Sequence, residues 1–570
     1  MHMHILFSNS LLWGSRVHLL PRESYWVATA LVIGVYFFWP SLSVALAEGT
    51  SGAAPAPSQT TQVQPMINRT SVNYFYIQEF RVDGGGNLLS QSEIGEAVYP
   101  YLGPYRSEDD IRQACAAVEK MYRDKGYVFV SVDYGPQKTK SGIIYLQVHL
   151  NQVGRLRVKG SRYYSIDEIK KEVPSLAEGK VFNVNDANKD IVSISQLHDR
   201  QVSILPHPGV VPGTYDIDLN VKDTLPLHGS LEINNRYSAL TDPLRLNGSI
   251  EYDNLWQLGH TISASFQISP QDPAQVEVIS GYYEAGIPGV DWLTLMLQGT
   301  DQNSNVSTLG SGGFSDLGIG QTIGMTAIIN LPSDASFYQS VSLGFDYKHY
   351  KQDLFIGGAD IPTPVTYYPL SAGYSVAWVG KDYQTTFNPS INMNMSGLGS
   401  NQQDFEVNRH GASPNYIYLR GDISHQHDLP GGFQVYGKAQ GQVADQPLVN
   451  NEQFSAGGLT TVRGYLESEE PGDNAILGSV ELRSPSVGNL IGKMVDEWRF
   501  YLFGEGGWLT FNQPLPSQQA SFTLCSVGAG TRIKFDDHFH GSLDFGVPLK
   551  DGTTTNAFEM RLTFRVWAEF

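Results

Sequence analysis

The fold class is indicated by the C-terminal stretch Arg561-Leu562-Thr563-Phe564-Arg565-Val566-Trp567-Ala568-Glu569-Phe570. Apolar side chains fill every even position, and the stretch ends on an aromatic residue. Because successive side chains of a β-strand point to opposite faces, this strand has one apolar face and one largely polar face. Such a terminal strand is typical of a membrane β-barrel whose last strand pairs with its first. A soluble protein can also end on an amphipathic strand.

The composition favours a chain rich in β-strands and argues against nucleic acid as the main partner. The chain has 570 residues, with 38 Lys and Arg against 57 Asp and Glu, and a formal net charge of -19. This acidity would repel a polyanion. The 58 Gly, 30 Tyr and 26 Phe suit long antiparallel strands that are joined by turns and flanked by aromatic girdles. An ordinary all-β protein would share much of this composition.

The N-terminus has the features of an export signal. Two arginines precede an apolar run over residues 25–39, and Ala45-Leu46-Ala47 follows as an A-x-A cleavage pattern. The run is short for a spanning helix, which needs about 20 residues. We therefore predict a signal peptide over residues 1–47, with an uncleaved anchor as the alternative. Residues 48–73 are rich in Ala, Pro, Ser, Gln and Thr, and we predict a linker there.

A small α+β unit is predicted after the linker, over residues 74–151. Its elements follow the order β-α-α-β-β, with strands at 75–82, 127–132 and 142–148 and helices at 90–98 and 107–125. Ser90 and Glu93 match the capping-box pattern at the start of the first helix. A weaker copy of the same order follows over residues 152–222, so the unit is predicted to be repeated.

From residue 223 onward the helical periodicity disappears and strict alternation replaces it. Apolar residues stand at every second position, as in Ile262/Ala264/Phe266/Ile268 and Val341/Leu343/Phe345/Tyr347, with small or polar residues between them. Strands that face lipid on one side and a watery lumen on the other alternate in this way. At about 20–22 residues per strand and connection, residues 223–570 are predicted to form a membrane β-barrel of about 16 antiparallel strands.

Further expectations concern connections and cysteines. The polar segments near 301–320, 352–366 and 399–415 are predicted to be surface loops. A soluble array of β-sandwiches is the alternative, but it would need an apolar core between two sheets, and large apolar residues show little excess. Cys115 and Cys525 fall in different predicted domains, so no disulfide is expected.

A search for catalytic patterns yields little. The 14 histidines are scattered, and His538 and His540 flank a predicted turn without a nearby third metal ligand. No nucleophile elbow, P-loop or zincin pattern is present in the sequence. We therefore expect no enzyme activity, no cofactor and no metal site.

The most specific local string is Phe454-Ser455-Ala456-Gly457-Gly458-Leu459-Thr460-Thr461-Val462-Arg463-Gly464-Tyr465. It lies in a connection from 444 to 474, which is far longer than strand closure requires. Such a loop can fold back into the lumen, where Arg463 would need a carboxylate partner. The alternative is an exposed loop with a solvated arginine.

These residues carry a resemblance to a known family. Val462-Arg463-Gly464-Tyr465 resembles the lid-loop signature of two-partner secretion transporters, the haemolysin activation/secretion branch of the POTRA-plus-barrel superfamily. Phe503-Gly504-Glu505-Gly506-Gly507 is similar to the barrel-wall motif of that family, Phe-x-acid-x-Gly, with Glu505 where Asp is commoner. Glu481-Leu482-Arg483-Ser484-Pro485 resembles the strand after the loop, and Asp253-Asn254-Leu255 resembles an early strand.

The resemblance implies the architecture and the site. The two α+β units would be POTRA domains, POTRA 1 over 74–151 and POTRA 2 over 152–222. The barrel over 223–570 would carry the lid loop near 444–474. Arg463 would pair with the wall motif, which is formed by Phe503, Glu505 and Gly507, although the longer glutamate leaves the geometry of the pair open.

The resemblance also implies partners. The chain would export a secreted client polypeptide with an N-terminal secretion domain, from the periplasm, where the POTRA domains would lie, to the cell exterior. It would sit in outer-membrane lipid and reach it through the barrel-assembly machinery. The C-terminal assembly signal for that machinery would be formed by Phe564, Val566 and Phe570.

Three rival functions and one departure from the family remain. A barrel-assembly insertase shares the lid motif but usually has three or more POTRA units, and a passive porin would explain the barrel alone. An enzyme with a barrel anchor is the third rival. Some relatives carry an N-terminal plug helix, whereas residues 48–73 contain Pro55, Pro57 and Pro65. We predict that a plug helix is absent or rudimentary here.

Overall fold

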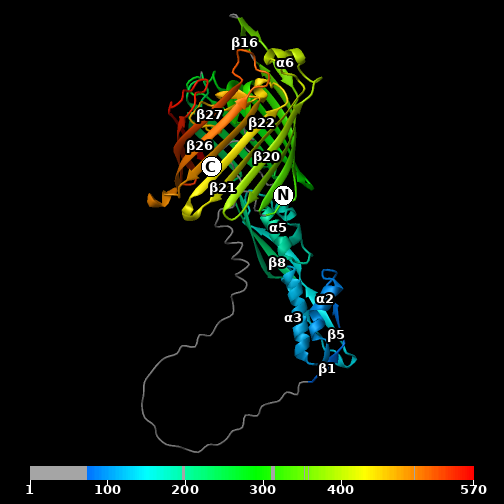
Figure 1. Cartoon of the computed structure of the whole chain (residues 1–570). Coiled ribbons are helices and arrows are strands. Elements are labelled where there is room, and N and C mark those ends of the chain that lie inside the picture. Colours follow the sequence, from blue (N-terminus) through cyan, green and yellow to red (C-terminus); the bar gives the residue numbers. More distant parts are fainter. Residues whose placement is uncertain are drawn as a thin grey trace, which may run out of the picture. The chain divides into compact units, whose positions relative to one another are not determined.

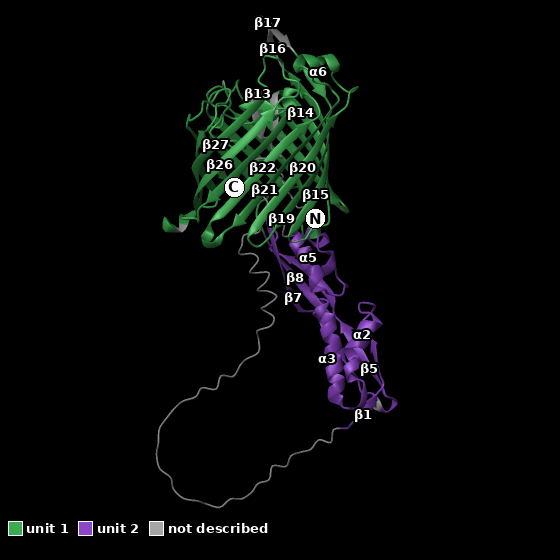
Figure 2. Ribbon diagram, viewed as in Figure 1, with its two compact units in different colours: residues 1–16, 162–168, 223–570 green, residues 17–161, 169–222 purple. Residues whose placement is uncertain are grey.

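The computed structural model describes residues 73–194, 199–239, 241–309, 315–334, 336–351, 353–356, 359–492 and 494–570. The predicted signal peptide and the question of a plug helix lie outside these residues, as does all of the predicted linker but residue 73. The described residues form two compact units (Figure 2). One comprises residues 223–570 with 162–168, and the other comprises the described residues up to 161 with 169–222.

The N-terminal unit begins with a β-α-α-β-β domain. A three-stranded sheet has the order β2-β5-β4, with β2 parallel to β5, and β1 and β3 form a separate two-stranded ribbon. The elements are β1 Phe75–Ile77, β2 Glu79–Asp83, α2 Gln91–Val98, β3 Gly103–Arg106, α3 Glu108–Asp124, β4 Val130–Asp133 and β5 Ile143–Leu150. The Ser90 capping box starts α2 as predicted. The predicted strand 75–82 is interrupted at Gln78, whose N–H donates to the carbonyl of Gly142.

A second domain of the same order follows in this unit, which confirms the predicted repeat. Its sheet has the order β6-β8-β7, with β6 parallel to β8. The elements are β6 Gln152–Lys159, α4 Ile166–Lys171, α5 Val184–Ile194, β7 Arg200–Pro208 and β8 Thr214–Asp223. Among the described residues, no helix combines the length and apolar character that crossing a membrane requires.

The two domains of this unit are joined end to end at Asn183. Its side-chain amide donates to the carbonyl of Lys125 at the C-terminus of α3, at 3.1 Å. Its Oδ1 accepts the N–H of Asn185 in the first turn of α5, at 2.9 Å. One side chain therefore caps the end of one helix and the start of another. Phe129 stacks on Tyr215 beside this joint, with ring centroids 3.8 Å apart.

The other unit is a closed antiparallel barrel of 16 strands, as predicted (Figure 1). One of these strands is built from two pieces, β18 and β19, which both pair with β15. The strands are β9 Leu227–Asn234, β10 Arg245–Leu255, β11 His260–Ile268, β12 Glu277–Ile287, β13 Val290–Leu309, β14 Ser315–Asn330, β15 Phe337–Lys351, β18 Val365–Tyr367, β19 Leu370–Val379, β20 Tyr383–Asn394, β21 Tyr416–Asp428, β22 Gln434–Ala444, β25 Asn474–Arg483, β26 Val495–Thr510, β27 Ser521–Phe535, β28 Phe539–Pro548 and β29 Arg561–Glu569.

The side chains of the barrel alternate between an apolar outer face and a packed, polar inner face. On β26, Phe500 and Leu502 are 47% and 63% exposed, whereas Phe503 is 5% exposed. Outward apolar residues on every strand suit contact with lipid rather than with water. A sandwich would bury these residues between two sheets, so the soluble alternative is wrong.

The terminal strand closes the barrel against the first strand, as its alternation predicted. β29 pairs with β9 from Arg565 opposite Asn234 to Glu569 opposite Ser230. Beyond the last strand residue, Phe570 and Gly229 exchange two backbone hydrogen bonds of 3.1 Å. The inner side of this seam carries a charge-assisted bond between Arg565 and Glu232, with Nη2 and Oε2 2.6 Å apart.

The predicted surface loops are more structured than expected. The loop over 301–320 is wrong, because β13 and β14 continue through most of it and pair as far as Leu309 opposite Ser315. The segment 352–366 contains a small hairpin, β16 Asp353–Ile356 with β17 Ala359–Pro362. The segment 399–415 contains α6, Gln402–Asn408, whose first turn is capped by Asn401 (Figure 1).

Candidate functional site

The connection between β22 and β25, residues 445–473, folds into the barrel and is called the lid loop below. It contains a short hairpin, β23 Phe454–Ala456 with β24 Glu470–Gly472. Most of its side chains are buried, and Arg463 is only 4% exposed. An exposed loop with a solvated arginine is therefore wrong.

Arg463 contacts Glu505 of β26 through three hydrogen bonds. The guanidinium Nε and Nη2 donate to Oε1 of Glu505 at 2.9 and 2.5 Å. The backbone N–H of Arg463 donates to Oε2 at 2.6 Å. The two oxygens of the glutamate therefore serve different purposes, one binding the guanidinium and one binding the loop backbone. A carboxylate that accepts several donors inside a protein is held strongly, provided that its charge is matched.

Two further carboxylates surround Arg463. Glu481 of β25 lies 2.8 Å from Nη2 and Asp544 of β28 lies 3.0 Å from Nη1. Glu481 also contacts Arg483 at 2.8 Å and Arg532 at 3.5 Å. Three carboxylates and three guanidinium groups thus form one balanced cluster. Sequence analysis placed neither Glu481 nor Asp544 at Arg463, although alternation puts Asp544 on the lumenal face between Leu543 and Phe545.

Aromatic rings complete the surroundings of the guanidinium. The carbon Cζ of Arg463 lies 3.6 Å from the ring centroid of Phe503, the aromatic residue of the wall motif. Tyr501, two positions before it on the same face, donates its hydroxyl to Asp544 at 2.6 Å. A cation over an aromatic face is attracted by the ring quadrupole, more so where water is excluded. Phe503 therefore contributes directly to holding Arg463.

Val462 and Tyr465 fix the loop on either side of Arg463 and Gly464. Val462 is fully buried in a cluster with Tyr465, Leu477, Leu509 and Leu524. The hydroxyl of Tyr465 donates to the carbonyl of Lys550 at 2.7 Å. Gly507 of the wall motif leaves room for the side chain of Leu477, because a Cβ at position 507 would lie only 2.8 Å from that side chain.

A second ion pair holds the loop near the barrel seam. Arg236, which follows β9, donates from Nε and Nη2 to the two oxygens of Glu467 at 2.9 and 3.1 Å. This is the parallel two-bond geometry that arginine and carboxylate favour. Both side chains are largely buried. Sequence analysis did not identify this pair, which joins residues 231 positions apart.

Comparison with known families decides the classification. The haemolysin secretion/activation protein family ShlB/FhaC/HecB matches residues 213–533, which is more than half of the chain. A POTRA domain of the ShlB type matches residues 75–150.

The chain belongs to the haemolysin secretion/activation family.

Curated relatives are similar to the chain in sequence, and solved structures are similar to it in fold. The outer membrane transporter CdiB of Escherichia coli is 23% identical over 481 residues, covering 82% of this chain and 78% of its own. The CdiB of Dickeya dadantii strain 3937 is 21% identical, covering 73% and 74%. The structure of CdiB from Escherichia coli has a TM-score of 0.64 at 20% identity, covering 89% and 93%. BamA from Haemophilus ducreyi without POTRA domains 1–3 has a TM-score of 0.54 at 13% identity, covering 87% and 100%, and shows the fold alone.

Family membership settles the class of protein. The chain is an outer-membrane β-barrel transporter of the two-partner secretion type, with a periplasmic POTRA domain before the barrel. A passive porin is therefore wrong. The family is one of transporters rather than enzymes.

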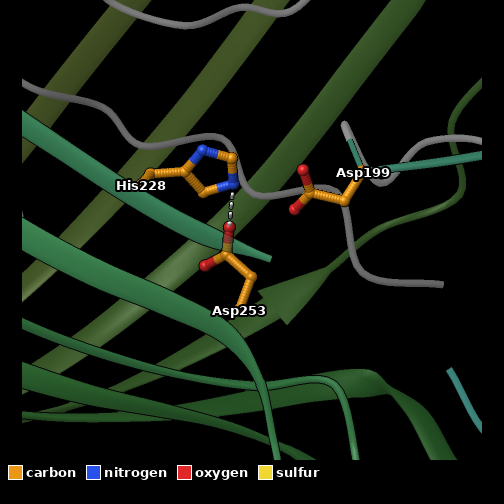
Figure 3. Close-up of side chains that lie close together, drawn as sticks. All are labelled: Asp199, His228 and Asp253. Carbon is orange, nitrogen blue, oxygen red and sulfur yellow. Dashed lines mark ion pairs between the residues drawn. The ribbon is translucent and has the colours of Figure 1, made fainter. Parts of the chain in front are cut away.

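Two other groups of residues from the sequence analysis lie elsewhere in this transporter. Asp253 of β10 contacts His228 of β9, with Nε2 of the histidine and Oδ2 of the aspartate 3.5 Å apart (Figure 3). Asp253 also accepts a hydrogen bond from the hydroxyl of Thr261 at 3.0 Å. Phe564, Val566 and Phe570 lie along the seam strand. Val566 and Phe570 are exposed, and the N–H of Phe564 donates to the side chain of Asn235 at 2.7 Å.

Proposed function

We propose that this transporter exports a secreted client polypeptide, with the lid loop as the gate of its lumen. The observation that carries the proposal is the position of Arg463, at the tip of a loop that enters the barrel, within the carboxylate cluster of Glu481, Glu505 and Asp544. A charged tip on a polar wall can be released, because water and other polar groups can replace each contact. An apolar plug would have no comparable replacement.

Client capture is proposed for the two domains of the N-terminal unit. We assign POTRA 1 to residues 74–151 and POTRA 2 to residues 152–222, before a barrel over 223–570. Each sheet leaves two edge strands, β2 and β4 in the first and β6 and β7 in the second. An unfolded client with an N-terminal secretion domain can add as a strand at such an edge, by main-chain hydrogen bonds.

The remaining residue assignments follow from the same proposal. Val462, Arg463, Gly464 and Tyr465 are the gate, and Phe503, Glu505 and Gly507 are the wall that receives it. Folding of the client outside the cell would bias its movement through the lumen. The seam residues Phe564, Val566 and Phe570 would be read by the barrel-assembly machinery, which delivers the chain into outer-membrane lipid.

Replacement of Arg463 by Ala tests the gate. It leaves three carboxylates close together without their shared cation, which we expect to displace the loop tip and to reduce client secretion severalfold. The amount of folded barrel is followed by heat-modifiable migration, and Lys381→Ala in the exposed turn between β19 and β20 is the control. Full secretion by Arg463→Ala at an unchanged barrel level would refute the assignment of the gate.

A further inference from the structure

The lid loop consists of two parts that are held in different ways. Its base comprises residues 448–456 and 470–473, which include the β23–β24 hairpin. Its tip comprises residues 457–469, which include Arg463 and Glu467. The two parts differ in what they contact, and the difference indicates which of them moves.

Glu452 anchors the base to the barrel wall. It is 2% exposed. Its Oε1 accepts from Lys348 of β15 at 2.9 Å and from the hydroxyl of Tyr367 in β18 at 2.7 Å. Its Oε2 accepts from the hydroxyl of Tyr418 in β21, also at 2.7 Å. A buried carboxylate with one cation and two hydroxyl donors has its charge matched and both of its oxygens hydrogen-bonded, so it holds its backbone firmly.

Asp473 joins the two ends of the base to each other. It has no exposed surface. Its Oδ1 accepts the N–H of Leu448 at 2.9 Å and the side-chain amide of Gln453 at 3.1 Å. Leu448 and Val449 also pack in an apolar cluster with tyrosines of the wall. The base is therefore a small packed element in its own right, and Glu452 connects this element to the wall.

Unusual backbone conformations mark both borders between base and tip. Gly457 and Gly458 have φ of 110° and 93°, and Ser468 on the returning chain has φ of 55°. A Cβ on Gly457 would lie 2.4 Å from the carbonyl oxygen of Leu466, so only glycine fits there. Residues that absorb large φ changes are expected at hinges.

The ionic anchors of base and tip contact different strands of the barrel, although β24 of the base also lies against β26. Glu452 of the base binds β15, β18 and β21. Arg463 of the tip binds β25, β26 and β28, and Glu467 of the tip binds Arg236 after β9. In the strand order of the barrel β22 separates β21 from β25, so the two groups of strands do not overlap. The loop therefore runs from a packed base, anchored on one group of strands, to ion pairs at its tip on another.

We propose that the base stays bound to the barrel wall during transport and that only residues 457–469 move out of the lumen. Glu452 is then the positioning residue that holds the base in place. This inference rests on the proposed function of the lid loop as a gate. Glu452 acts through the rest of the loop, because it sets the point from which the tip reaches Glu505.

The first test measures the closed pore without any client. Full-length Glu452→Gln leaves Lys348 buried beside a neutral amide, so the base should loosen and the tip should miss its partners. In planar bilayers we expect the occupancy of the open pore to rise at least about tenfold. The double variant Lys348→Gln/Glu452→Gln removes both charges and should return the occupancy toward that of the unmodified protein. Glu406→Gln on α6, where Glu406 is exposed and contacts His410, is the matched control.

The second test asks whether the base opens. Ser455 and Pro471 are paired across the β23–β24 hairpin. Cysteines at both positions, in a chain with Cys115→Ala and Cys525→Ala, can form a disulfide that locks this hairpin. Proteolytic cleavage of the chain between the two cysteines, followed by non-reducing electrophoresis, shows whether the disulfide has formed. We expect equal client secretion under oxidising and reducing conditions.

Two outcomes would overturn the inference. One is an unchanged open-pore occupancy in Glu452→Gln with a normally folded barrel. The other is secretion that stops when the Ser455–Pro471 position is locked and returns on reduction, since the base would then have to open. Neither outcome depends on the Arg463→Ala result, so failure of the inference is distinguishable from failure of the proposed gate.

Discussion

Gly464 at the tip of the lid loop and Gly546 of β28 lie backbone against backbone. A Cβ on Gly546 would lie 2.6 Å from the amide nitrogen of Gly464 and 2.8 Å from its Cα. Gly464 itself has φ of 94°, and a Cβ there would lie 3.2 Å from the carbonyl carbon of Gly546. The facing glycines bring the loop close enough for Arg463 to reach Asp544, two positions before Gly546.

Replacement of Gly546 by Val should therefore open the pore. The new side chain would hold the tip off the wall and lengthen the contacts of Arg463. We expect at least about a tenfold increase in open-pore occupancy in planar bilayers, equivalent to about 1.4 kcal/mol. Gly504→Val on β26 is the matched control, because a Cβ there meets no atom within 4 Å. Equal occupancy in the two variants would contradict the close-approach argument.

Asp218 should make the second POTRA domain sensitive to acid. Its hydrogen bonds with Lys159, then His207 and Arg157, hold its pKa well below the usual value. Because the folded pKa is lowered, the stabilisation is complete above the unfolded pKa of about 4 and is lost as the pH falls below it. We expect the amides of β8 to lose protection from hydrogen exchange below about pH 4, after correction for the intrinsic rate.

The Asp218→Asn variant supplies the comparison for this experiment. It should have weaker protection of β8 at neutral pH and little further change on acidification. Asp186→Asn, at an exposed position on α5, should behave like the unmodified protein. The same acid response in Asp218→Asn as in the unmodified protein would assign the effect to other carboxylates.

Cys115 should be nearly inert to alkylation in the folded protein. Burial, with smaller effects from Asp133 and Glu119, raises the pKa of its thiol to about 11. Only about one thiol in a thousand would then be ionised at pH 8, and the thiolate is the reactive form. In a Cys525→Ala chain, labelling by N-ethylmaleimide followed by mass spectrometry should be slow until urea unfolds the domain. Rapid labelling without urea would show that the domain opens readily.

Phe570 should matter for insertion of the barrel. Its ring packs over Gly229, where a Cβ would lie 2.6 Å from it, and its backbone pairs with the same residue. Deletion of Phe570 should reduce the heat-modifiable barrel in the outer membrane severalfold, and Phe570→Ala should reduce it less. Phe558→Ala, in an exposed loop, should leave the amount unchanged. A normal barrel level after the deletion would remove Phe570 from the assembly signal.

The barrel could be predicted because its evidence is local. Each strand carries its own alternation, and the number of strands follows from the length of the alternating region. The extension of β13 and β14 could not be predicted, because residues such as Ser304 and Gly318 pair through the backbone in a stretch whose sequence lacks apolar alternation. The break at Gln78 and the short strand β3 likewise depend on contacts with other segments.

The candidate site could be predicted only in part. Arg463 and Glu505 were linked through motifs, and alternation alone placed Glu505 on the lumenal face. The other partners depend on the register of the closed barrel, since Asp544 lies 81 positions from Arg463. Glu452 is more distant still from its cation, Lys348, at 104 positions. No local sequence pattern predicts contacts between residues so far apart in the chain. An acidic residue inside a long glycine-containing loop is nevertheless a reason to look for a cationic partner.

The cap that Asn183 shares between α3 and α5 has a mechanical consequence. A bend at this joint would strip hydrogen bonds from the end of one helix and the start of the next at the same moment. The shared cap therefore opposes bending between the two helices. A force applied to the first domain would therefore be transmitted through α3 and α5 to the second domain.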